Sequence, residues 1–587
     1  MRANEGQRSP RRVEAITALN KVAPSINLTL FAEGIDLPSP MVFQRRANSW
    51  LSALRKKVRE QGISSTRIGF AQFDILDTLR SEMIIRNALA LANVHIAQAL
   101  LEKLPSGRIA IDENLTEFSV CDVARFVENG NEHRIKSERQ THRSLSALHV
   151  YAYNAKQSLY RFRRSFIGPK RRIRPHLSGN VLAIPRLPGH LSDILPVAHQ
   201  LRDRYLVETV FGVVDRGMER EVKRDDFDAV DLLALGRKST DASDSLISKA
   251  LADATRLLND SSLVEIDEFS EAEIKALAYV TETVLRTNLR QLVRVATAME
   301  ELVKNHRPSL IFASNPYTLE GRIAVNVARA HRIPTASIEH GTIYKEDPMW
   351  AECCLDLMCV WGQPSRRALL SSGLTDQQIA VTGAPRFDEI NKRISSDLET
   401  RDLRKDNVLV ATSGAGDKVS LEEHKAFIKS LYTAASLTPD ISWVVKLHKK
   451  DNPDLYREVE RQFPGARVEV VPSERQNFGP DIFSFLASAR AMVTICSTSA
   501  LDAMLVDVPV VSVAINSDTA KGLEFLERGC TIEANSGVEL AAAINKIWEG
   551  SADLRVVEAA RLYIAEHCTN LGTAGKQVAD RIFALMD

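Results

Sequence analysis

The feature that most constrains the fold is a series of short, uninterrupted apolar runs separated by longer stretches of helical periodicity. Strands that are buried on both faces read as continuous runs, which is typical of a parallel sheet covered by helices. The runs form two tandem blocks. The first contains "NVLAIP" (180–185), "ETVFGVV" (208–214), "SLIFAS" (309–314), "TASIEHG" (335–341), "LDLMCVWG" (355–362) and "QIAVTGAP" (378–385). The second contains "VLVATS" (408–413), "SWVVKLH" (442–448), "RVEVVP" (467–472), "AMVTICS" (491–497) and "VPVVSVAI" (508–515).

Two such blocks predict an α/β protein with two doubly wound, Rossmann-like domains that face each other across a cleft. In such sheets ligands bind beyond the carboxyl ends of the strands. A charged stretch at 389–407 separates the blocks, so we expect a first domain at 177–397 and a second at 398–587. Residues 1–176 form a mixed, partly helical N-terminal region whose role the sequence does not indicate.

Composition excludes several classes of protein. The chain has 587 residues with 76 Lys and Arg against 75 Asp and Glu, so its net charge of +1 argues against a dedicated nucleic-acid binder. Seven cysteines at irregular spacing indicate a reducing, cytoplasmic location. The most apolar stretch, 83–101, is interrupted by polar residues such as Arg86 and Asn87, which predicts a buried helix rather than a membrane span.

The most informative motif is "ICSTSALDAM" (495–504), in which three hydroxyl residues follow a strand and open a helix. Ser497, Thr498 and Ser499 could bind a phosphate together with the unpaired N–H groups of the helix start, and Asp502 could accept from ribose hydroxyls. The alternative is a capping box formed by Ser499 and Asp502.

Two further motifs of the second block suggest donor binding. In "VVKLHKK" (444–450), His448 follows a buried strand and lies among cations that include Lys446, so it could hold a diphosphate or stabilise a departing phosphate. In "TSGAGDK" (412–418), Gly414 and Gly416 would let the backbone approach a ligand closely. The alternatives are a solvated strand end and an ordinary turn.

Two motifs of the first block suggest acid–base chemistry. "IEHG" (338–341) places Glu339 and His340 at the end of a strand, where they could transfer a proton or stabilise an oxyanion. "AIPRLPGHLSD" (183–193) offers His190 and Asp193 as candidate bases for an acceptor hydroxyl. The alternatives are a buried, hydrogen-bonded histidine in the first motif and a turn leading into a helix in the second.

We expect no metal and no cofactor, because no His/Cys pairs match at metal-ligand spacing and no Asp-x-Asp motif stands where it could hold a metal-bound diphosphate. A basic run with interleaved aromatic residues at 153–174 has two interpretations. It could contact an anionic membrane where a lipid-linked acceptor is presented, or it could be a solvated linker. Localisation is therefore expected to be cytoplasmic, with peripheral contact at the inner face of the membrane as an open alternative.

Together, the ordered motifs "IEHG", "LMCVWGQPSRRALLSSGL", "IAVTGAPRFDEI", "VVKLHKK" and "CSTSALDAML" resemble the GT-B glycosyltransferase-like proteins of bacterial surface-polysaccharide assembly. Similar families include CDP-glycerol glycerophosphotransferases, capsule transferases that use CMP-activated sugars, and non-hydrolysing UDP-N-acetylglucosamine 2-epimerases. The resemblance covers about 180–587.

The resemblance implies that His448 and the hydroxyl run contact the donor phosphate, that Asp502 faces the ribose, and that His340 and Gly341 match a "QHG" signature. Arg386 follows the "GxPRFD"-like turn and is expected on the donor side. Two residues depart from the family pattern, since Lys449 replaces the usual Pro and Glu339 replaces the usual Gln.

The sequence and the resemblance together predict a metal-independent glycosyltransferase. It would move a sugar or polyol phosphate from a nucleotide-activated donor, CMP- or CDP-linked, to a hydroxyl of a glycan or lipid-linked glycan acceptor. The alternatives are a UDP-sugar 2-epimerase and a non-catalytic assembly subunit of the same fold.

Overall fold

The structure is a computed structural model. It describes residues 12–14, 40–60, 65–68, 71–103, 109–112, 127, 135–137, 180–214, 216–236, 245, 247–249, 251–253, 268–350, 352–388, 406–414, 419, 421–448, 451–471, 482–513 and 523–586. The basic aromatic run at 153–174 and Gly416 lie outside these residues.

The first domain is built on a seven-stranded sheet in which every pairing is parallel, with the order β12-β11-β10-β9-β6-β7-β8. Chain order reverses at the β6–β9 pair, which is where ligands bind in open α/β sheets. The strands are β6 (Asn180–Ile184), β7 (Glu208–Val213), β8 (Asp228–Asp231), β9 (Leu310–Ala313), β10 (Thr335–Ile338), β11 (Leu357–Val360) and β12 (Ile379–Val381).

Helices cover both faces of this sheet. Side chains alternate along each strand, so Val181 and Ala183 of β6 face one apolar cluster, whereas Leu182 and Ile184 face another. The connecting helices are η2 (Pro188–His190), α6 (Leu191–Tyr205), α7 (Arg216–Arg224), α8 (Leu232–Leu235), α10 (Glu271–His306), α11 (Leu319–His331), η5 (Pro348–Trp350), α12 (Gln363–Ser371), η6 (Asp376–Gln378) and η7 (Pro385–Phe387).

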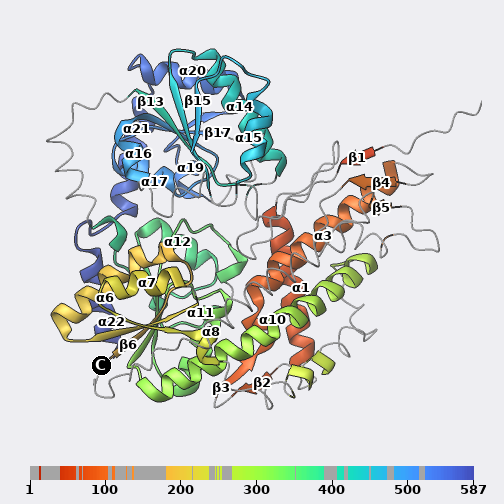
Figure 1. Cartoon of the computed structure of the whole chain (residues 1–587), viewed down its shortest axis with the longest axis vertical. Helices are drawn as coiled ribbons and strands as arrows, with labels where there is room; N and C mark the ends of the chain where they lie inside the picture. Colours follow the sequence, from red (N-terminus) through yellow and green to blue (C-terminus); the bar gives the residue numbers. More distant parts are fainter. Residues whose placement is uncertain are drawn as a thin grey trace, which may run out of the picture.

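The second domain carries a six-stranded parallel sheet in the order β15-β14-β13-β16-β17-β18. Its strands are β13 (Asn407–Ala411), β14 (Ser442–Lys446), β15 (Val468–Val471), β16 (Ala489–Thr494), β17 (Val510–Val513) and β18 (Ile532–Ala534). Its helices are α14 (Leu421–Leu437), α15 (Pro453–Glu460), α16 (Ile482–Ser488), α17 (Ser499–Leu505), α19 (Glu524–Glu527), α20 (Gly537–Trp548) and α21 (Leu554–His567). The two doubly wound α/β domains predicted from the sequence are therefore confirmed (Figure 1).

The last helix, α22 (Ala574–Met586), returns to the first domain and packs against α6 (Figure 1). Tyr205 stacks on Phe583 with ring centroids 4.1 Å apart and donates a hydrogen bond of 2.6 Å to Asp580. Asp388 accepts from the first two backbone N–H groups of α22 at 2.8 and 2.7 Å. The second domain as we predicted it, 398–587, thus includes a helix that the structure places on the first domain.

The N-terminal region contributes a helical layer on the side of the first domain (Figure 1). Its long helices pack on α10, and their side chains share one apolar cluster with β6, β9 and α11. Trp50 Nε1 and Asn87 Nδ2 both donate to Thr281 of α10, at 3.4 and 3.2 Å. The elements are β1 (Arg12–Glu14), α1 (Pro40–Glu60), β2 (Ser65–Ile68), β3 (Ala71–Asp74), α2 (Ile75–Thr78), α3 (Arg80–Lys103), β4 (Ile109–Asp112) and β5 (Ile135–Ser137).

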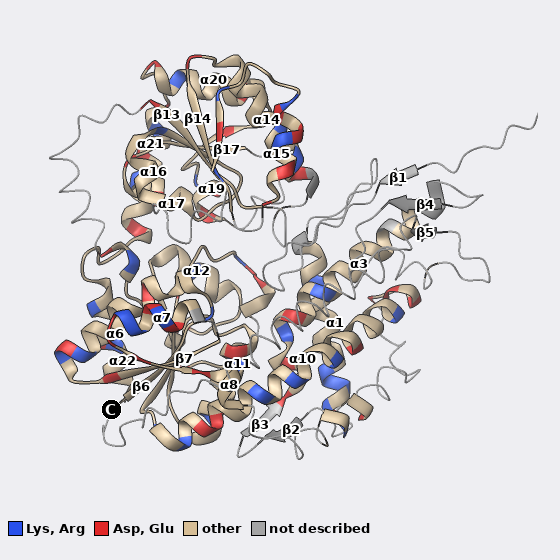
Figure 2. Cartoon of the chain, viewed as in Figure 1, with Lys and Arg blue, Asp and Glu red and all other residues tan. Residues whose placement is uncertain are grey.

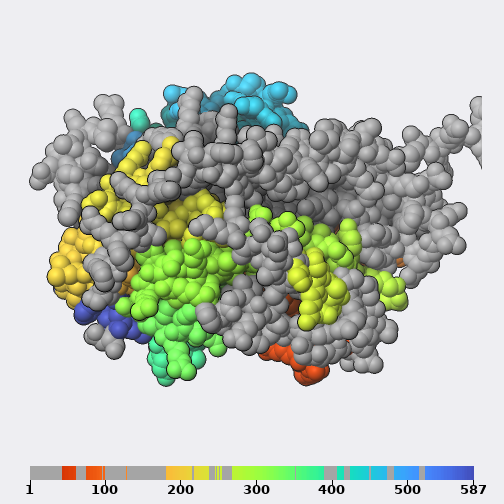
Figure 3. Space-filling view, turned by 60° about the horizontal axis from the view of Figure 1, so that its bottom comes forward, coloured from red at the N-terminus to blue at the C-terminus, as the bar shows by residue number. Residues whose placement is uncertain are grey.

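Charges of both signs are interspersed along the helices of both domains (Figure 2). In a space-filling view the cyan surface of the second domain lies above the yellow-to-green surface of the first (Figure 3). Among the described helices, none combines the length and apolarity needed to cross a bilayer.

Candidate functional site

The carboxyl edges of the two sheets meet at one polar contact. Thr342 follows β10 in the first domain, and Thr498 immediately precedes α17 in the second. The two hydroxyl oxygens lie 2.9 Å apart, and the backbone N–H of Thr342 also donates to Thr498 Oγ1 at 3.3 Å. A Cβ added to Gly341 would lie 3.7 Å from the same oxygen. The structure therefore brings the "IEHG" and "CSTSALDAM" motifs together across the interface between the domains.

A pair of histidines lies at the carboxyl edge of the first sheet. The rings of His190 and His340 are 4.3 Å apart between centroids, and His190 is buried whereas His340 is partly exposed. Ser314 Oγ lies 2.8 Å from His190 Nδ1, and the side-chain nitrogen of Asn315 lies 3.4 Å from His340 Nε2. Burial lowers the pKa of His340 to about 4, with the positive charge of Arg386 acting in the same direction. His340 is therefore neutral at physiological pH.

Glu339 points away from this pair, into the first domain. One carboxylate oxygen accepts from the backbone N–H of Trp361 and the other from the hydroxyl of Ser365, both at 2.7 Å. Burial raises the pKa of Glu339 to about 8, although these two donors act in the opposite direction. The side chain thus ties β10 to the start of α12.

Asp193 is also enclosed, in the first turn of α6. Its carboxylate lies 3.3 Å from Arg386 Nε, and the Arg386 guanidinium also covers the Trp361 ring at 5.5 Å. Burial raises the pKa of Asp193 to about 6 against the effect of Arg386. Arg386, which we expected on the donor side, therefore pairs with a residue that we expected to be a base. Glu339 and Asp193 are fully buried and held by donors within the first domain, whereas His340 is partly exposed.

In the second domain the hydroxyl run is partly exposed, and the capping box expected from the sequence is absent. The N-cap residue is Thr498, its side chain makes no capping bond, and the capping box of Ser499 and Asp502 is not formed. Ser497 Oγ instead accepts from the backbone N–H of Ser499 at 3.2 Å. Because α17 spans only residues 499–505, hydroxyls and loop N–H groups would contribute more to anion binding than a helix dipole.

His448 stands two residues beyond β14, in a loop fixed by a buried polar network. Its backbone N–H donates to Asp451 Oδ2 at 2.6 Å and lies 2.7 Å from Thr412 Oγ1. The other oxygen of Asp451 lies 2.8 Å from His424 Nε2 and accepts from Tyr456 at 3.4 Å. This network joins the loops that follow β13 and β14, which carry Gly414 and His448.

His448 and the start of α17 lie on the same edge of the second sheet. The loops that carry them follow β14 and β16, and both strands pair with β13 between them. Neighbouring strands are about 4.8 Å apart, so the two loops begin about 10 Å from each other. Lys446 and Asp502 also interact across β13: burial lowers the pKa of Lys446, and the negative charge of Asp502 acts in the opposite direction.

Sequence reasoning missed Ser314, Asn315, Thr342, His424 and Asp451. Asn315 and Thr342 have a visible signal, since each follows a strand of the first block at the edge where ligands bind. The pairing of His424 with Asp451 joins residues of a helix and a loop, and no sequence spacing indicates it. Within the part of the chain that the structure describes, no three His, Cys, Asp or Glu side chains converge in a way that could hold a metal ion.

No protein-family model matches this sequence, and no curated protein is significantly similar to it. Solved structures with a similar arrangement include UDP-GlcNAc 2-epimerase from Neisseria meningitidis bound to UDP-GlcNAc, at 15% identity and a TM-score of 0.45 over 69% of this chain and 100% of that one. The calicheamicin glycosyltransferase CalG4 matches at 16% identity and a TM-score of 0.42 (70% and 99% covered), and a glycosyltransferase from Rickettsia africae at 11% and 0.42 (70% and 100%). At these scores the likeness carries no conclusion about reaction or substrate.

Proposed function

We propose that this protein is a glycosyltransferase that moves a sugar or polyol phosphate from a nucleotide-activated donor to a hydroxyl of a glycan acceptor, without a metal ion. The observation that carries the proposal is the contact between Thr342 and Thr498. It brings the sheet edge that carries the histidine pair against the hydroxyl run at 497–499, which we propose as the anion site. A transferase needs these two groups in this relation, with an acceptor base on one side and a phosphate site on the other.

The donor would lie on the second domain. Its phosphates would receive hydrogen bonds from Ser497, Thr498 and Ser499 and from the loop of His448, whose imidazole would meet the charge that develops on the leaving phosphate. The nearby amine of Lys446 would supply a positive charge, and the negative charge of its neighbour Asp502 would favour the protonated form. Gly414 lies in the loop after β13, where a nucleoside could approach the backbone closely.

The acceptor would enter from the first domain. Its hydroxyl would be deprotonated by His340 or His190, which are neighbours and are oriented by Asn315 and Ser314. Asp193, Arg386 and Glu339 would position this edge from inside the domain rather than contact substrate. Closure of the domains around both substrates would exclude water and limit hydrolysis of the donor.

A thermal-shift panel of CMP, CDP, UDP and GDP in the presence of EDTA tests the donor site first. We expect nucleotides of one nucleobase to raise the melting temperature. The diphosphate or monophosphate should raise it clearly more than the matching nucleoside does. The corresponding sugar nucleotides are then incubated with and without glycan acceptors, and the products are analysed by mass spectrometry and NMR.

Acceptor-dependent release of the nucleotide supports transfer. An epimerised UDP-sugar formed without acceptor would replace the proposal with epimerisation. If none of the nucleotides binds, the proposal fails and a non-catalytic assembly role takes its place.

A further inference from the structure

The connection between β10 and β11 touches three parts of the molecule. Thr342 meets Thr498 of the second domain, and Lys345 pairs with Glu527 of the same domain at 2.5 Å. Within the first domain, the backbone N–H groups of Glu346 and Asp347 donate to hydroxyls at the end of α12, both at 3.1 Å. The third part is the N-terminal helical layer, which the connection reaches through two glutamates.

Both glutamates have left-handed backbone conformations, which residues with a Cβ seldom adopt. Glu346 has φ 54° and Glu352 has φ 56°. Such conformations persist only where surrounding contacts impose them. Each of these glutamates also pairs with an N-terminal arginine: Arg45 lies 3.3 Å from the Glu346 carboxylate, and Arg80 lies 2.9 Å from that of Glu352.

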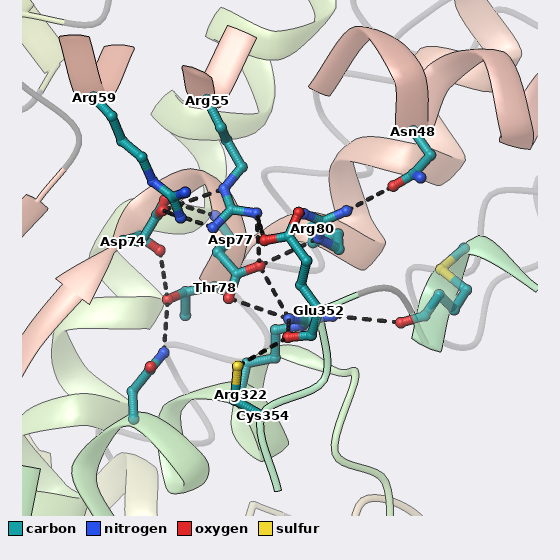
Figure 4. A network of polar contacts seen from close by, with 12 residues as sticks. Asn48, Arg55, Arg59, Asp74, Asp77, Thr78, Arg80, Arg322, Glu352 and Cys354 are labelled. Atoms are coloured by element: carbon teal, nitrogen blue, oxygen red, sulfur yellow. Dashed lines mark hydrogen bonds and ion pairs between the residues drawn. The ribbon is translucent and has the colours of Figure 1, made fainter. Parts of the chain in front are cut away.

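The Glu352 end is the stronger of the two. Arg80 is fully buried, and it also donates to Asn48 of α1 at 2.6 Å and to Asp77 of α2 at 3.2 Å, whereas Arg55 of α1 binds the second oxygen of Glu352 (Figure 4). Arg322 of α11 closes the network from the first domain. It donates to both oxygens of Asp77, at 3.0 and 3.1 Å, and to the backbone carbonyl of Glu352 at 3.4 Å.

We propose that the N-terminal helices brace the β10–β11 connection so that Thr342 reaches the phosphate site at Thr498, with Glu352 and Glu346 as positioning residues. This gives the described helices of residues 40–103 a role in positioning the site. The effect of these helices on nucleotide binding rests on the proposed function, whereas their effect on the position of the β10–β11 connection does not.

The test is hydrogen–deuterium exchange of the full-length protein without ligand. Because no nucleotide is added, a negative result counts against the role of the N-terminal helices and not against the proposed function. Loss of a charge-assisted contact should open the connection markedly more often, and we expect Glu352→Gln to speed exchange of peptides covering 341–350 by about tenfold. Peptides at 497–501, across the contact, should also exchange faster, whereas peptides of α3 and α10 should not change. Thr342→Val should speed exchange at 497–501 as well, and adding Glu352→Gln to it should give no further increase there.

Asp507→Asn is the matched control. Asp507 is also a carboxylate with positive φ (57°) that pairs with an arginine, at 2.9 Å from Arg561. It lies in the second domain, away from the contacts of Glu346 and Glu352 with the N-terminal helices. It should leave exchange at 341–350 unchanged. Glu346→Gln replaces Glu352→Gln if the latter does not fold. Unchanged exchange at 341–350 in the folded glutamate variants, or an increase spread evenly over the first domain, would overturn the proposal.

Discussion

Replacing Glu339 by Gln distinguishes a structural role of this buried carboxyl from a role as the catalytic base. Burial raises the pKa of this carboxyl from 4.5 to about 8. Gln has the same shape and mimics the protonated form, because its oxygen can accept from Trp361 N–H while its amide donates to Ser365. The variant should therefore fold and, if Glu339 is not the base, keep most of its transfer activity.

The sign and size of the effect on stability follow from linkage. A group whose pKa is raised by folding stabilises the protein below its unfolded pKa, and this contribution is lost as pH rises toward the folded value. A difference of one between the folded and unfolded pKa corresponds to about 1.4 kcal/mol, so the wild type loses up to ~5 kcal/mol between pH 4.5 and about 8, whereas Glu339→Gln does not. Between pH 5.5 and 7.5 the variant should gain ~3 kcal/mol relative to the wild type.

Urea unfolding of the two proteins at several pH values measures this difference. Glu533→Gln, a substitution at an exposed site of the second domain, is the control and should give a curve parallel to the wild type. A stability difference between Glu339→Gln and wild type that does not change with pH would refute the argument that the carboxyl is protonated inside the domain. Loss of transfer at full stability would restore Glu339 as the base.

Three further substitutions test other parts of the account. His448→Ala should reduce transfer by at least about a hundredfold while circular dichroism stays unchanged, and near-normal turnover would remove His448 from the site. Asp451→Ala should destabilise the second domain by about 3–5 kcal/mol in urea unfolding because it leaves His424 buried without its carboxylate, and a loss below ~1 kcal/mol would contradict the network. Gly383→Ala should destabilise the protein more than Gly373→Ala. Both glycines have positive φ (90° and 100°), but a Cβ at 383 would lie 2.1 Å from the Thr569 carbonyl oxygen, whereas one at 373 meets nothing within 4 Å. Equal losses of stability in the two variants would exclude the close contact at Gly383.

Most strands of both α/β domains were predictable because continuous apolar runs are a local signal, but β8 and β18, which have no such run, were not predicted. The sheet order was not, because pairing β6 with β9 and β13 with β16 joins segments far apart in the chain. The apolar stretch 83–101 was correctly predicted as a buried helix, but its packing against α10 depends on surfaces that the sequence does not show as partners. The return of α22 to the first domain was missed for the same reason.

At the site, the motifs indicated the right edges of the sheets but not the direction of each side chain. Glu339 and His340 are adjacent, and neighbouring residues at a strand end point to opposite sides, so one reaches the histidine pair and the other enters the domain. The hydroxyls at 497–499 were expected to cap a helix or bind phosphate, and the contact of Thr498 with Thr342 shows that Thr498 faces the other domain. This contact joins residues 156 positions apart, so no local pattern could indicate it.

Calorimetry in EDTA, on wild type and on the Ser497→Ala/Ser499→Ala variant, tests the central claim most directly. The titrants are the nucleotide with the largest thermal shift and its parent nucleoside. We predict that the nucleotide binds wild type without a divalent cation and that the variant loses about tenfold or more of this affinity, while the weaker nucleoside binding stays the same. Nucleotide binding that requires Mg²⁺, or that is equally strong in the variant, would contradict the account.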